Sequence, residues 1–320
     1  MDPTPTQPVH VIGIDAGGTK TVCLLCDSEG RLVAEARGEG ANLHSAGELA
    51  VEKVLHGLMD RVLDERPFVP AAICLGIAGV DRQADVSVVS QLMRRIGHKA
   101  RIVVTNDALV ALVAGVGEGP GIVVIAGTGS IAYGRNGRNQ AARAGGWGYV
   151  LGDEGSGYWI GRHALRAVVR ESDGRGRLTA ITPHILGQLG LERPQDLVHA
   201  VYHADLKPSA IAALARCVQQ ARDEGDPIAQ AILAEAAREL AASAASVARR
   251  VGLEDEAFPF FLSGGMFHAI PWLVEGLSER LRQVAPRATV RVLDREPAWG
   301  AVELAIAAAH GGVDLPVYVV

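Results

Sequence analysis

Hydrophobic residues in the first third of the chain alternate between strand-like runs and helical spacing. Apolar runs at 9–14, 21–26 and 32–36 are joined by the turn-forming segments AGGTK and DSEG, which predicts an antiparallel meander of three strands. Helical spacing predicts helices over 45–63, 85–96 and 107–116, with strands at 71–77 and 102–105 between them. We therefore expect the chain to open with an α/β domain.

The pattern then repeats after a cluster of glycines and one proline at 115–121. Predicted strands follow at 122–125, 131–133 and 139–144, again joined by glycine turns. The remaining pattern predicts these elements: helices over 154–170, 208–222, 227–251, 268–284 and 297–310, and strands at 258–262 and 289–293. This duplication predicts two related domains, 1–115 and 116–296.

Each half presents a glycine turn at the end of an apolar strand. Glycines let backbone N–H groups turn toward an anion with no Cβ in its way, and threonine adds a hydroxyl donor. The candidate residues are Asp15, Gly17, Gly18, Thr19 and Lys20 in the first turn, and Gly127, Thr128, Gly129 and Ser130 in the second. Two such turns facing a cleft could bind phosphates, with Asp15 holding Mg²⁺ directly or through water. An ordinary hairpin is the alternative for either turn alone.

Three further segments carry candidate chemistry. Gly264 and Gly265 could let an adenine or ribose lie against backbone, or could simply form a tight connection between strand and helix. Asp107 could cap its helix or act as a general base. The glycine-rich segment 145–160, with Trp147 and Asp153, suits a carbohydrate, although Asp153 or Ser156 could instead cap the following helix.

Composition excludes several classes of function. The chain has 320 residues, 48% of them hydrophobic, and its formal net charge of -5 without a basic run is no footprint for nucleic acid. No apolar stretch approaches the ~20 residues that span a bilayer, and the leader MDPTPTQP resembles no secretion signal. We therefore expect a disordered lead-in, cytoplasmic residence and no membrane partner.

The pair Cys23 and Cys26 invites a metal or redox interpretation. The pair lies inside the strand-like run TVCLLCD, whereas redox pairs usually open a helix and zinc pairs come with a second pair. Buried structural thiols are therefore the favoured interpretation.

The order DAGGTK, TNDA, GTGS, GGWGxxxGDEGSxYWIG, LSGGMF resembles the eukaryotic-type N-acetylglucosamine kinase family. That family shares its domain with activating ATPases of the benzoyl-CoA reductase type. The resemblance spans Val11 to about Ala309 and implies the fold of the actin, sugar kinase and heat-shock chaperone superfamily. That fold has two ribonuclease H-like α/β domains with ATP in the cleft between them. The first domain would be completed by the C-terminal segment, about 297–320.

The resemblance also implies roles for individual residues. Thr19 and Thr128 match threonines that contact phosphate, and Asp107 matches the base that activates the sugar 6-hydroxyl. Asn42, Gly146, Trp147, Gly148 and Asp153 fall on sugar-binding positions. Ala212 falls near an adenine-flanking position, an alignment that rests only on the GDP at 225–227. Asp15 stands where some animal members have Glu.

These features predict an ATP- and Mg²⁺-dependent kinase that phosphorylates an amino sugar, N-acetylglucosamine first, and that forms a homodimer. Glucosamine, N-acetylmuramic acid and N-acetylmannosamine remain open as substrates. An activating ATPase would need cysteines for an iron-sulfur cluster. A second sugar kinase family that begins DxGGTK often carries a cysteine-rich zinc motif that this sequence lacks. A sugar-sensing regulator would need a DNA-binding module, which no segment supplies.

Overall fold

The computed structural model describes residues 9–64, 66, 69–203 and 206–319, so the predicted lead-in at 1–8 lies outside the described residues. The chain divides into two compact units. Unit 1 holds the residues up to Pro120 together with Leu293–Val317, and unit 2 holds Gly121–Val292 and the residues from Tyr318 onward. We propose that these units are the two predicted domains. Among the described residues, no helix combines the length and apolar character needed to cross a membrane.

Unit 1 is built on a five-stranded sheet in the order β3-β2-β1-β4-β5. Its strands are β1 (His10–Ala16), β2 (Lys20–Asp27), β3 (Leu32–Glu39), β4 (Ala72–Ile77) and β5 (Arg101–Thr105). The first three pair antiparallel, which confirms the predicted meander, while β4 pairs parallel with both β1 and β5. The carboxyl ends of β1, β4 and β5 therefore meet at one edge of the sheet.

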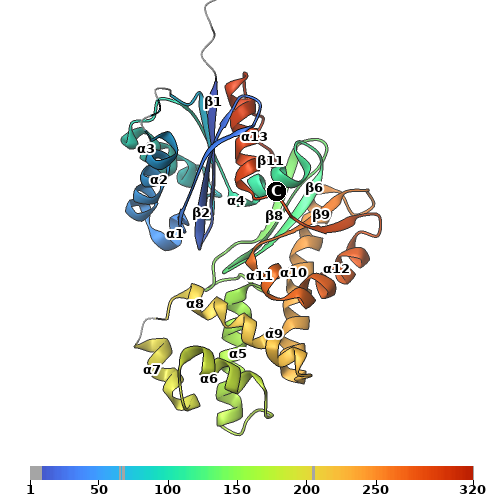
Figure 1. The fold of residues 1–320 in the computed structure, drawn as a ribbon. Helices are drawn as coiled ribbons and strands as arrows, with labels where there is room; N and C mark the ends of the chain where they lie inside the picture. Colours follow the sequence, from blue (N-terminus) through green and yellow to red (C-terminus); the bar gives the residue numbers. More distant parts are fainter. Residues whose placement is uncertain (1–8, 65, 67–68, 204–205, 320) are drawn as a thin grey trace, which may run out of the picture. The chain divides into compact units, whose positions relative to one another are not determined.

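Helices cover both faces of this sheet (Figure 1). One face packs against α1 (Leu43–Ala46), α2 (Glu48–Leu63) and α3 (Gln83–Ile96), and the other against α4 (Asp107–Val116) and α13 (Ala298–Ala309). The contact of α13 with β1 is very close, since a Cβ on Gly13 would lie 2.4 Å from the backbone nitrogen of Val302. The C-terminal helix is thus part of the core of unit 1.

Unit 2 repeats this topology. Its sheet has the order β10-β9-β6-β7-β8-β11. The strands are β6 (Gly121–Ala126), β7 (Ser130–Arg135), β8 (Gln140–Gly145), β9 (Pro259–Ser263), β10 (Thr289–Val292) and β11 (Val317–Tyr318). β6, β7 and β8 pair antiparallel and β6, β9 and β10 parallel, as β1 to β5 do. The predicted internal duplication and the α/β class are confirmed.

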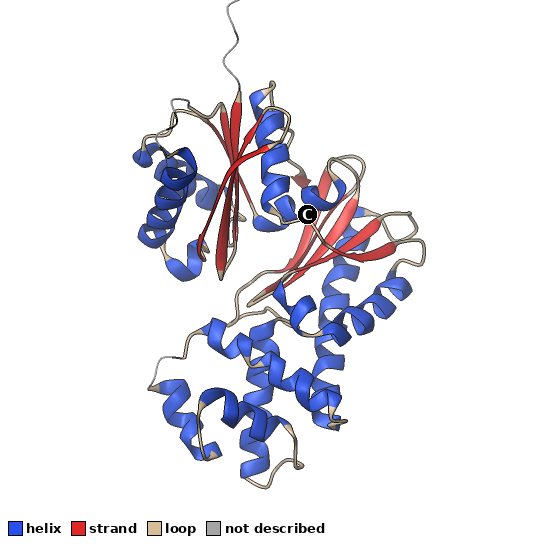
Figure 2. Ribbon diagram, in the orientation of Figure 1, coloured by secondary structure: helices blue, strands red, loops and turns tan. Residues whose placement is uncertain are grey.

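Unit 2 has a large helical part beside its sheet (Figure 2). These helices contribute most of its apolar core. Its helices are α5 (Gly157–Ser172), α6 (Ile181–Leu189), the 3₁₀ helix η1 (Pro194–Asp196), α7 (Leu197–Tyr202), α8 (Pro208–Ala213), α9 (Ala215–Asp223), α10 (Pro227–Val251), α11 (Gly265–Ala269) and α12 (Pro271–Val284). The Ala-rich α10 buries one face along its length.

Several predicted helix bounds were wrong. The helix expected at 154 begins at Gly157, because the Ser156 side chain accepts from the Trp159 backbone N–H and caps it. The helix expected over 208–222 breaks into α8 and α9 at Leu214. The helix expected from 268 is divided by Pro271, which opens α12. The short β11 lies in the sheet of unit 2, although the prediction assigned 297–320 to the first domain.

Candidate functional site

The β1–β2 turn is a supported loop with an open outer surface. The Gly17 N–H donates to the Lys20 carbonyl at 3.0 Å and closes the turn. A Cβ on Gly40 would lie 2.3 Å from the Gly18 carbonyl oxygen, so the chain after β3 supports the turn from behind. A Cβ on Gly18 itself would meet no atom within 4 Å. An anion can therefore approach the turn at Gly18.

The predicted phosphate-binding lysine is held by a carboxylate from the other end of unit 1. Lys20 Nζ lies 3.2 Å from Glu296 Oε1, just before α13. Both oxygens of Glu296 also accept from the Arg37 guanidinium, at 2.8 and 2.7 Å. Lys20 remains 60% exposed. Because Arg37 already satisfies Glu296, Lys20 can turn to an incoming anion without leaving that carboxylate unpaired.

Acidic side chains gather at the edge of the unit 1 sheet where the parallel strands end. Asp15 lies on β1 and Asp107 follows β5. Burial, and the negative charge of Asp107, raise the pKa of Asp15 to about 8. Burial and the neighbouring Asp81 raise the pKa of Asp107 to about 7. A bound cation, or a proton on one of the two carboxyl groups, would therefore stabilise this pair.

Asp107 does not cap its helix. The cap of α4 is Asn106, whose side chain accepts from the Leu109 backbone N–H at 2.7 Å. Asp107 occupies the first helical position and is partly exposed. Asp107 is therefore not the N-cap residue, although its carboxylate accepts from the backbone N–H groups of Asp107 and Ala108 in the first turn. Sequence reasoning missed Asp81, which the parallel order of β4 and β5 could have indicated.

Asn42, the predicted sugar-binding asparagine, is fixed by the backbone. Its Oδ1 accepts from the N–H groups of His44 and Ser45, each at 3.0 Å, and caps α1. Gly79, at φ +86°, lies against it, since a Cβ there would be 3.3 Å from Oδ1. With the oxygen engaged, the amide nitrogen is the group that Asn42 can offer a ligand as a donor.

The β6–β7 turn in unit 2 rests on the start of α5. The Gly127 N–H donates to the Gly129 carbonyl at 2.9 Å and closes the turn. The carbonyls of Gly127 and Thr128 accept from the N–H groups of Gly157 and Tyr158, at 2.9 and 3.2 Å. A Cβ on Gly127 would meet no atom within 4 Å, as in the first turn. The start of α5 thus supports the second turn, and an anion can approach it at Gly127.

Asp153 lies against this turn. Its carboxylate accepts from the backbone N–H groups of Ser130 and Gly148, yet burial outweighs these bonds and raises its pKa to about 6. The residue is 7% exposed and has a φ of +61°. A Cβ on Gly129 would lie 2.6 Å from Asp153 Oδ2. The predicted cap of α5 is Ser156, so the capping alternative for Asp153 is also wrong.

The other predicted sugar-binding residues form a glycine-rich loop. Gly146 and Gly148 have φ values of +71° and +80°, which favour glycine. Trp147 between them is 57% exposed, with the Arg143 guanidinium 4.9 Å from its ring centre. An exposed indole beside backbone amides is a suitable platform for the apolar face of a sugar ring.

The remaining nucleotide candidates of unit 2 meet around Gly157. A Cβ on Gly157 would lie 3.0 Å from the Gly127 carbonyl oxygen, 3.1 Å from the Ala212 Cβ and 2.7 Å from the Met266 sulfur. Gly264, at φ +107°, lies against Ala126 at the end of β6. The weakly aligned Ala212 is therefore close to the second turn and to the 264–266 segment, and Met266 is a neighbour that sequence reasoning missed.

The structure thus gathers the candidate residues into two groups. Unit 1 carries Asp15, Gly17, Gly18, Thr19, Lys20, Asn42 and Asp107, and unit 2 carries Gly127, Thr128, Gly129, Gly146, Trp147, Gly148, Asp153, Ala212, Gly264 and Gly265. In the part of the chain that the structure describes, no three His, Cys, Asp or Glu side chains gather as metal ligands. Asp15 is thus the candidate for holding Mg²⁺, with bound phosphates completing the coordination.

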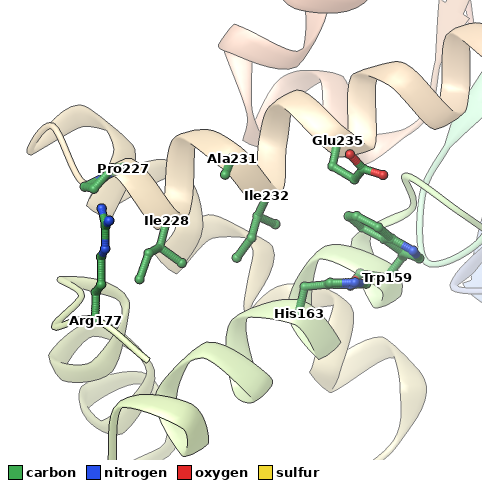
Figure 3. A pocket seen from close by; sticks show the side chains of 8 residues that line it. All are labelled: Trp159, His163, Arg177, Pro227, Ile228, Ala231, Ile232 and Glu235. Atoms are coloured by element: carbon green, nitrogen blue, oxygen red, sulfur yellow. The ribbon is translucent and has the colours of Figure 1, made fainter. Parts of the chain in front are cut away.

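A separate hollow of about 500 Å³ lies between α5 and α10 (Figure 3). Its walls are mainly apolar, and the side chains of Trp159, His163 and Glu235 lie together toward one end of it, with Arg177 toward the other. None of the predicted site residues lines this hollow. Its mainly apolar walls differ from the two glycine turns, where backbone N–H groups and hydroxyls are the candidate ligand contacts.

The cysteines are buried in different places. Cys23 packs with the residues that face α2 and α3, and Cys26 with those that face α4 and α13, so the two thiols lie on opposite faces of β2. Burial raises the pKa of Cys23 to about 12 and that of Cys26 to about 11. This pair cannot bind one metal ion together or form a disulfide with each other.

The chain matches the BadF/BadG/BcrA/BcrD ATPase family over residues 12–305. It is 36% identical over 303 residues to the N-acetylmuramic acid/N-acetylglucosamine kinase of Clostridium acetobutylicum, covering 92% of this chain and 98% of the relative. It is 35% identical over 309 residues to the N-acetyl-D-glucosamine kinase of Dictyostelium discoideum, covering 92% of this chain and 97% of the relative.

Solved structures confirm the predicted fold. A candidate N-acetylglucosamine kinase from Chromobacterium violaceum gives a TM-score of 0.76 at 30% identity, over 93% of this chain and 99% of that one. A ROK family glucokinase from Streptomyces griseus, in complex with glucose and AMPPNP, gives 0.60 at 19% identity, over 94% and 100%, and so shows the fold alone. With its family match spanning both units, the chain belongs to the BadF/BadG/BcrA/BcrD ATPase family, among relatives that include N-acetylglucosamine kinases.

Proposed function

We propose that this protein is an ATP-dependent amino-sugar kinase that converts N-acetylglucosamine to N-acetylglucosamine 6-phosphate. The observation that carries the proposal is the state of Asp107, a partly exposed carboxyl that is not a helix cap and whose pKa is raised to about 7. A general base works best when its pKa lies near the working pH. Two relatives over nearly the whole chain, both named as kinases of amino sugars, support the same function.

In this mechanism Asp107 accepts the proton of the sugar 6-hydroxyl while the oxygen attacks the γ-phosphorus of ATP. The new O–P bond forms as the bond to the β-phosphate oxygen breaks, and ADP leaves with the electron pair. The carboxylate then holds the proton until solvent removes it. The burial that raises the pKa of Asp107 also makes the group basic enough for this step.

Both glycine turns fit a triphosphate, because Gly18 and Gly127 leave open space where a side chain would stand. Backbone N–H groups with Thr19, Thr128 and Lys20 supply donors of the kind that bind phosphate oxygens. Bound Mg²⁺ would neutralise part of the phosphate charge. Asp15 would hold that ion, since burial and the charge of Asp107 raise its pKa and a bound cation would stabilise its carboxylate form. Ala212, Gly264 and Gly265 are proposed to flank the adenosine.

For the sugar, Asn42 offers an amide donor, Trp147 an apolar platform and Asp153 a carboxylate beside the glycine loop. N-acetylmuramic acid is the second candidate, because the Arg143 guanidinium over Trp147 places a positive charge next to this loop. A lactyl carboxylate could pair with such a charge. A homodimer and cytoplasmic residence complete the proposal.

An activating ATPase is a weaker interpretation because of where the thiols lie. All four cysteines are buried. Cys74 lies in the core beneath α13, and Cys217 donates to the His184 carbonyl at 3.5 Å. Thiolates that share an iron-sulfur cluster between subunits need to reach the surface.

The test is ADP release by the purified chain with MgATP and a panel of sugars. The panel contains N-acetylglucosamine, N-acetylmuramic acid, glucosamine, N-acetylmannosamine and glucose, and ³¹P NMR identifies the phosphorylated oxygen. We expect turnover of N-acetylglucosamine with phosphate on the 6-oxygen. Activity confined to glucose would refute the amino-sugar assignment, and no turnover of any sugar would refute the kinase. Stoichiometric iron in anaerobically purified protein would favour the activating ATPase.

A further inference from the structure

One carboxylate touches both of the ligand-binding segments of unit 2. We propose that Asp153 is a positioning residue that fixes the β6–β7 turn against the 146–152 loop, so that the nucleotide and the sugar are each bound less well without it. The proposal rests on the function proposed above for the identity of the two ligands. It adds a role to the direct sugar contact that the resemblance implies.

The geometry places Asp153 between the two segments. Its oxygens accept from the N–H of Ser130, the first residue of β7 directly after the turn, and from the N–H of Gly148, in the loop. Oδ2 also occupies the space beside Gly129, where a Cβ would come within 2.6 Å of it. The residue has a φ of +61° and is 7% exposed, so an uncommon backbone conformation is combined with burial at this position.

The same segments are joined on either side of this carboxylate. The Gly146 N–H donates to the Ser130 carbonyl at 2.9 Å, and the Ser130 hydroxyl donates to the Glu154 carbonyl at 2.8 Å. Asp153 supplies the charged part of this network, and hydrogen bonds to a charged acceptor are stronger than those to a neutral one. An asparagine removes the charge and replaces one acceptor oxygen by an NH₂ donor, so it holds the two N–H groups less strongly.

Asp153→Asn tests the proposal through two separate binding measurements. Calorimetry gives the Kd of a non-hydrolysable ATP analogue without sugar, and the Kd of N-acetylglucosamine without nucleotide. We expect both affinities to fall about tenfold, equivalent to about 1.4 kcal/mol each. A direct sugar contact alone predicts that nucleotide affinity stays within twofold of the unmodified chain, and that result would overturn the proposal.

A pair of glycine substitutions approaches the same carboxylate from the other side. Gly129→Ala leaves Asp153 in the sequence but puts a methyl group into its carboxylate. Gly137→Ala, between β7 and β8, puts the same group into open space. We expect Gly129→Ala to weaken sugar binding about tenfold in the absence of nucleotide, and Gly137→Ala to leave sugar binding unchanged. Equal sugar affinity in the two variants would contradict the coupling.

These outcomes separate the positioning role from overall stability and from the function itself. Calorimetry reports the affinity of the folded molecules, so a lower Tm alone does not mimic the expected result. If the unmodified chain binds ATP but no amino sugar, the proposed function fails. The nucleotide measurement on Asp153→Asn still decides whether the carboxylate positions the turn.

Discussion

Asn106 and Asp107, at the start of α4, have separate proposed roles, one in capping the helix and one in proton transfer. Asn106 caps α4 through its bond to the Leu109 N–H, while Asp107 keeps a carboxyl with a pKa near 7. The first turn of α4 favours a negative charge at Asp107, yet this gain does not outweigh the cost of burying that charge, because the pKa of Asp107 is still raised. A group that is unfavourable for folding and suited to proton transfer is a strong candidate for a catalytic residue.

Replacing Asp107 by Asn should separate catalysis from stability. We expect kcat to fall by 10²- to 10⁴-fold, the usual contribution of a general base. The folded-state pKa of Asp107 lies above the ~3.9 of an unfolded Asp, so its stabilising contribution is present only at low pH and is lost as pH rises through about 7. The Asn variant should therefore be at least as stable at pH 8.

Steady-state kinetics and thermal unfolding at pH 8 check this prediction. Asn106→Ala is the matched control, because it removes the cap and should lower Tm. Near-normal kcat in Asp107→Asn would place the base elsewhere, with Asp153 the next residue to examine.

The pH dependence of catalysis should report the same carboxyl. Burial and the charge of Asp81 raise the pKa of Asp107 to about 7, and a base must be deprotonated to act. We expect kcat/KM to rise about tenfold per pH unit below 7 and to level off above it. A profile from pH 5.5 to 8.5 tests this, and a level profile across that range would exclude Asp107 as the base.

At the scale of elements, the glycine turns depend on residues outside their motifs. Gly40, after β3, passes so close to the first turn that its Cβ would lie 2.3 Å from the Gly18 carbonyl oxygen. Gly157 and Tyr158 in α5 hold the carbonyls of the second turn. The position of each phosphate-binding backbone is thus set by the next element that packs behind it.

Gly40→Ala should therefore weaken nucleotide binding although residue 40 carries no side chain toward a ligand. The added methyl group must displace the backbone of the first turn, and we expect the Kd for an ATP analogue to rise at least tenfold. Gly38→Ala is the matched control on the same strand, since its Cβ would only touch the Leu58 side chain at 3.4 Å. Equal affinities in the two variants would show that the turn tolerates the displacement.

The sequence predicted every described strand except the short β11, and it predicted the duplication and most of the long helices, because each produces a local pattern of apolar residues. It missed α6, α7 and the four-residue α1. The segment of α6 contains Pro183 and Gly187, and α7 is only six residues long, too short for helical periodicity to appear. The contacts of Asp153 with Ser130, and of Lys20 with Glu296, join distant parts of the chain. Such contacts leave no local pattern, so the support behind the candidate residues could not be predicted.

At the scale of the whole molecule, unit 1 is discontinuous in sequence. Its sheet is formed by residues before Pro120, yet one face of that sheet is covered by α13 from the C-terminal end. Besides the contact at Gly13, a Cβ on Gly300 would lie 2.0 Å from the Val110 carbonyl oxygen in α4. α13 therefore supports both the strand that carries Asp15 and the helix that Asp107 opens.

A chain ending at Val292 should fail to form unit 1. Without α13, the buried side chains of β1, β2 and β4 on that face would be exposed to water. We expect backbone amides of β1 to exchange with solvent within minutes in the shortened chain, while those of β9 remain protected. Adding a peptide of residues 293–317 should restore protection in β1. Protected β1 amides in the shortened chain alone would contradict this view.

Because unit 1 is discontinuous in sequence, it can be completed only after α13 has been synthesised. The main part of unit 2, Gly121–Val292, leaves the ribosome between β5 and α13, which at bacterial or eukaryotic speeds takes roughly ten to thirty seconds. During that interval the apolar residues of unit 1 that pack against α13 are exposed, and such surfaces favour aggregation and are the reason why chaperones exist. Slow codons late in the message would lengthen this exposure, whereas a circular permutant that begins with α13 would end it. The yield of soluble protein from such a permutant, compared with that from the natural chain, would measure how much protein aggregates because α13 is made last.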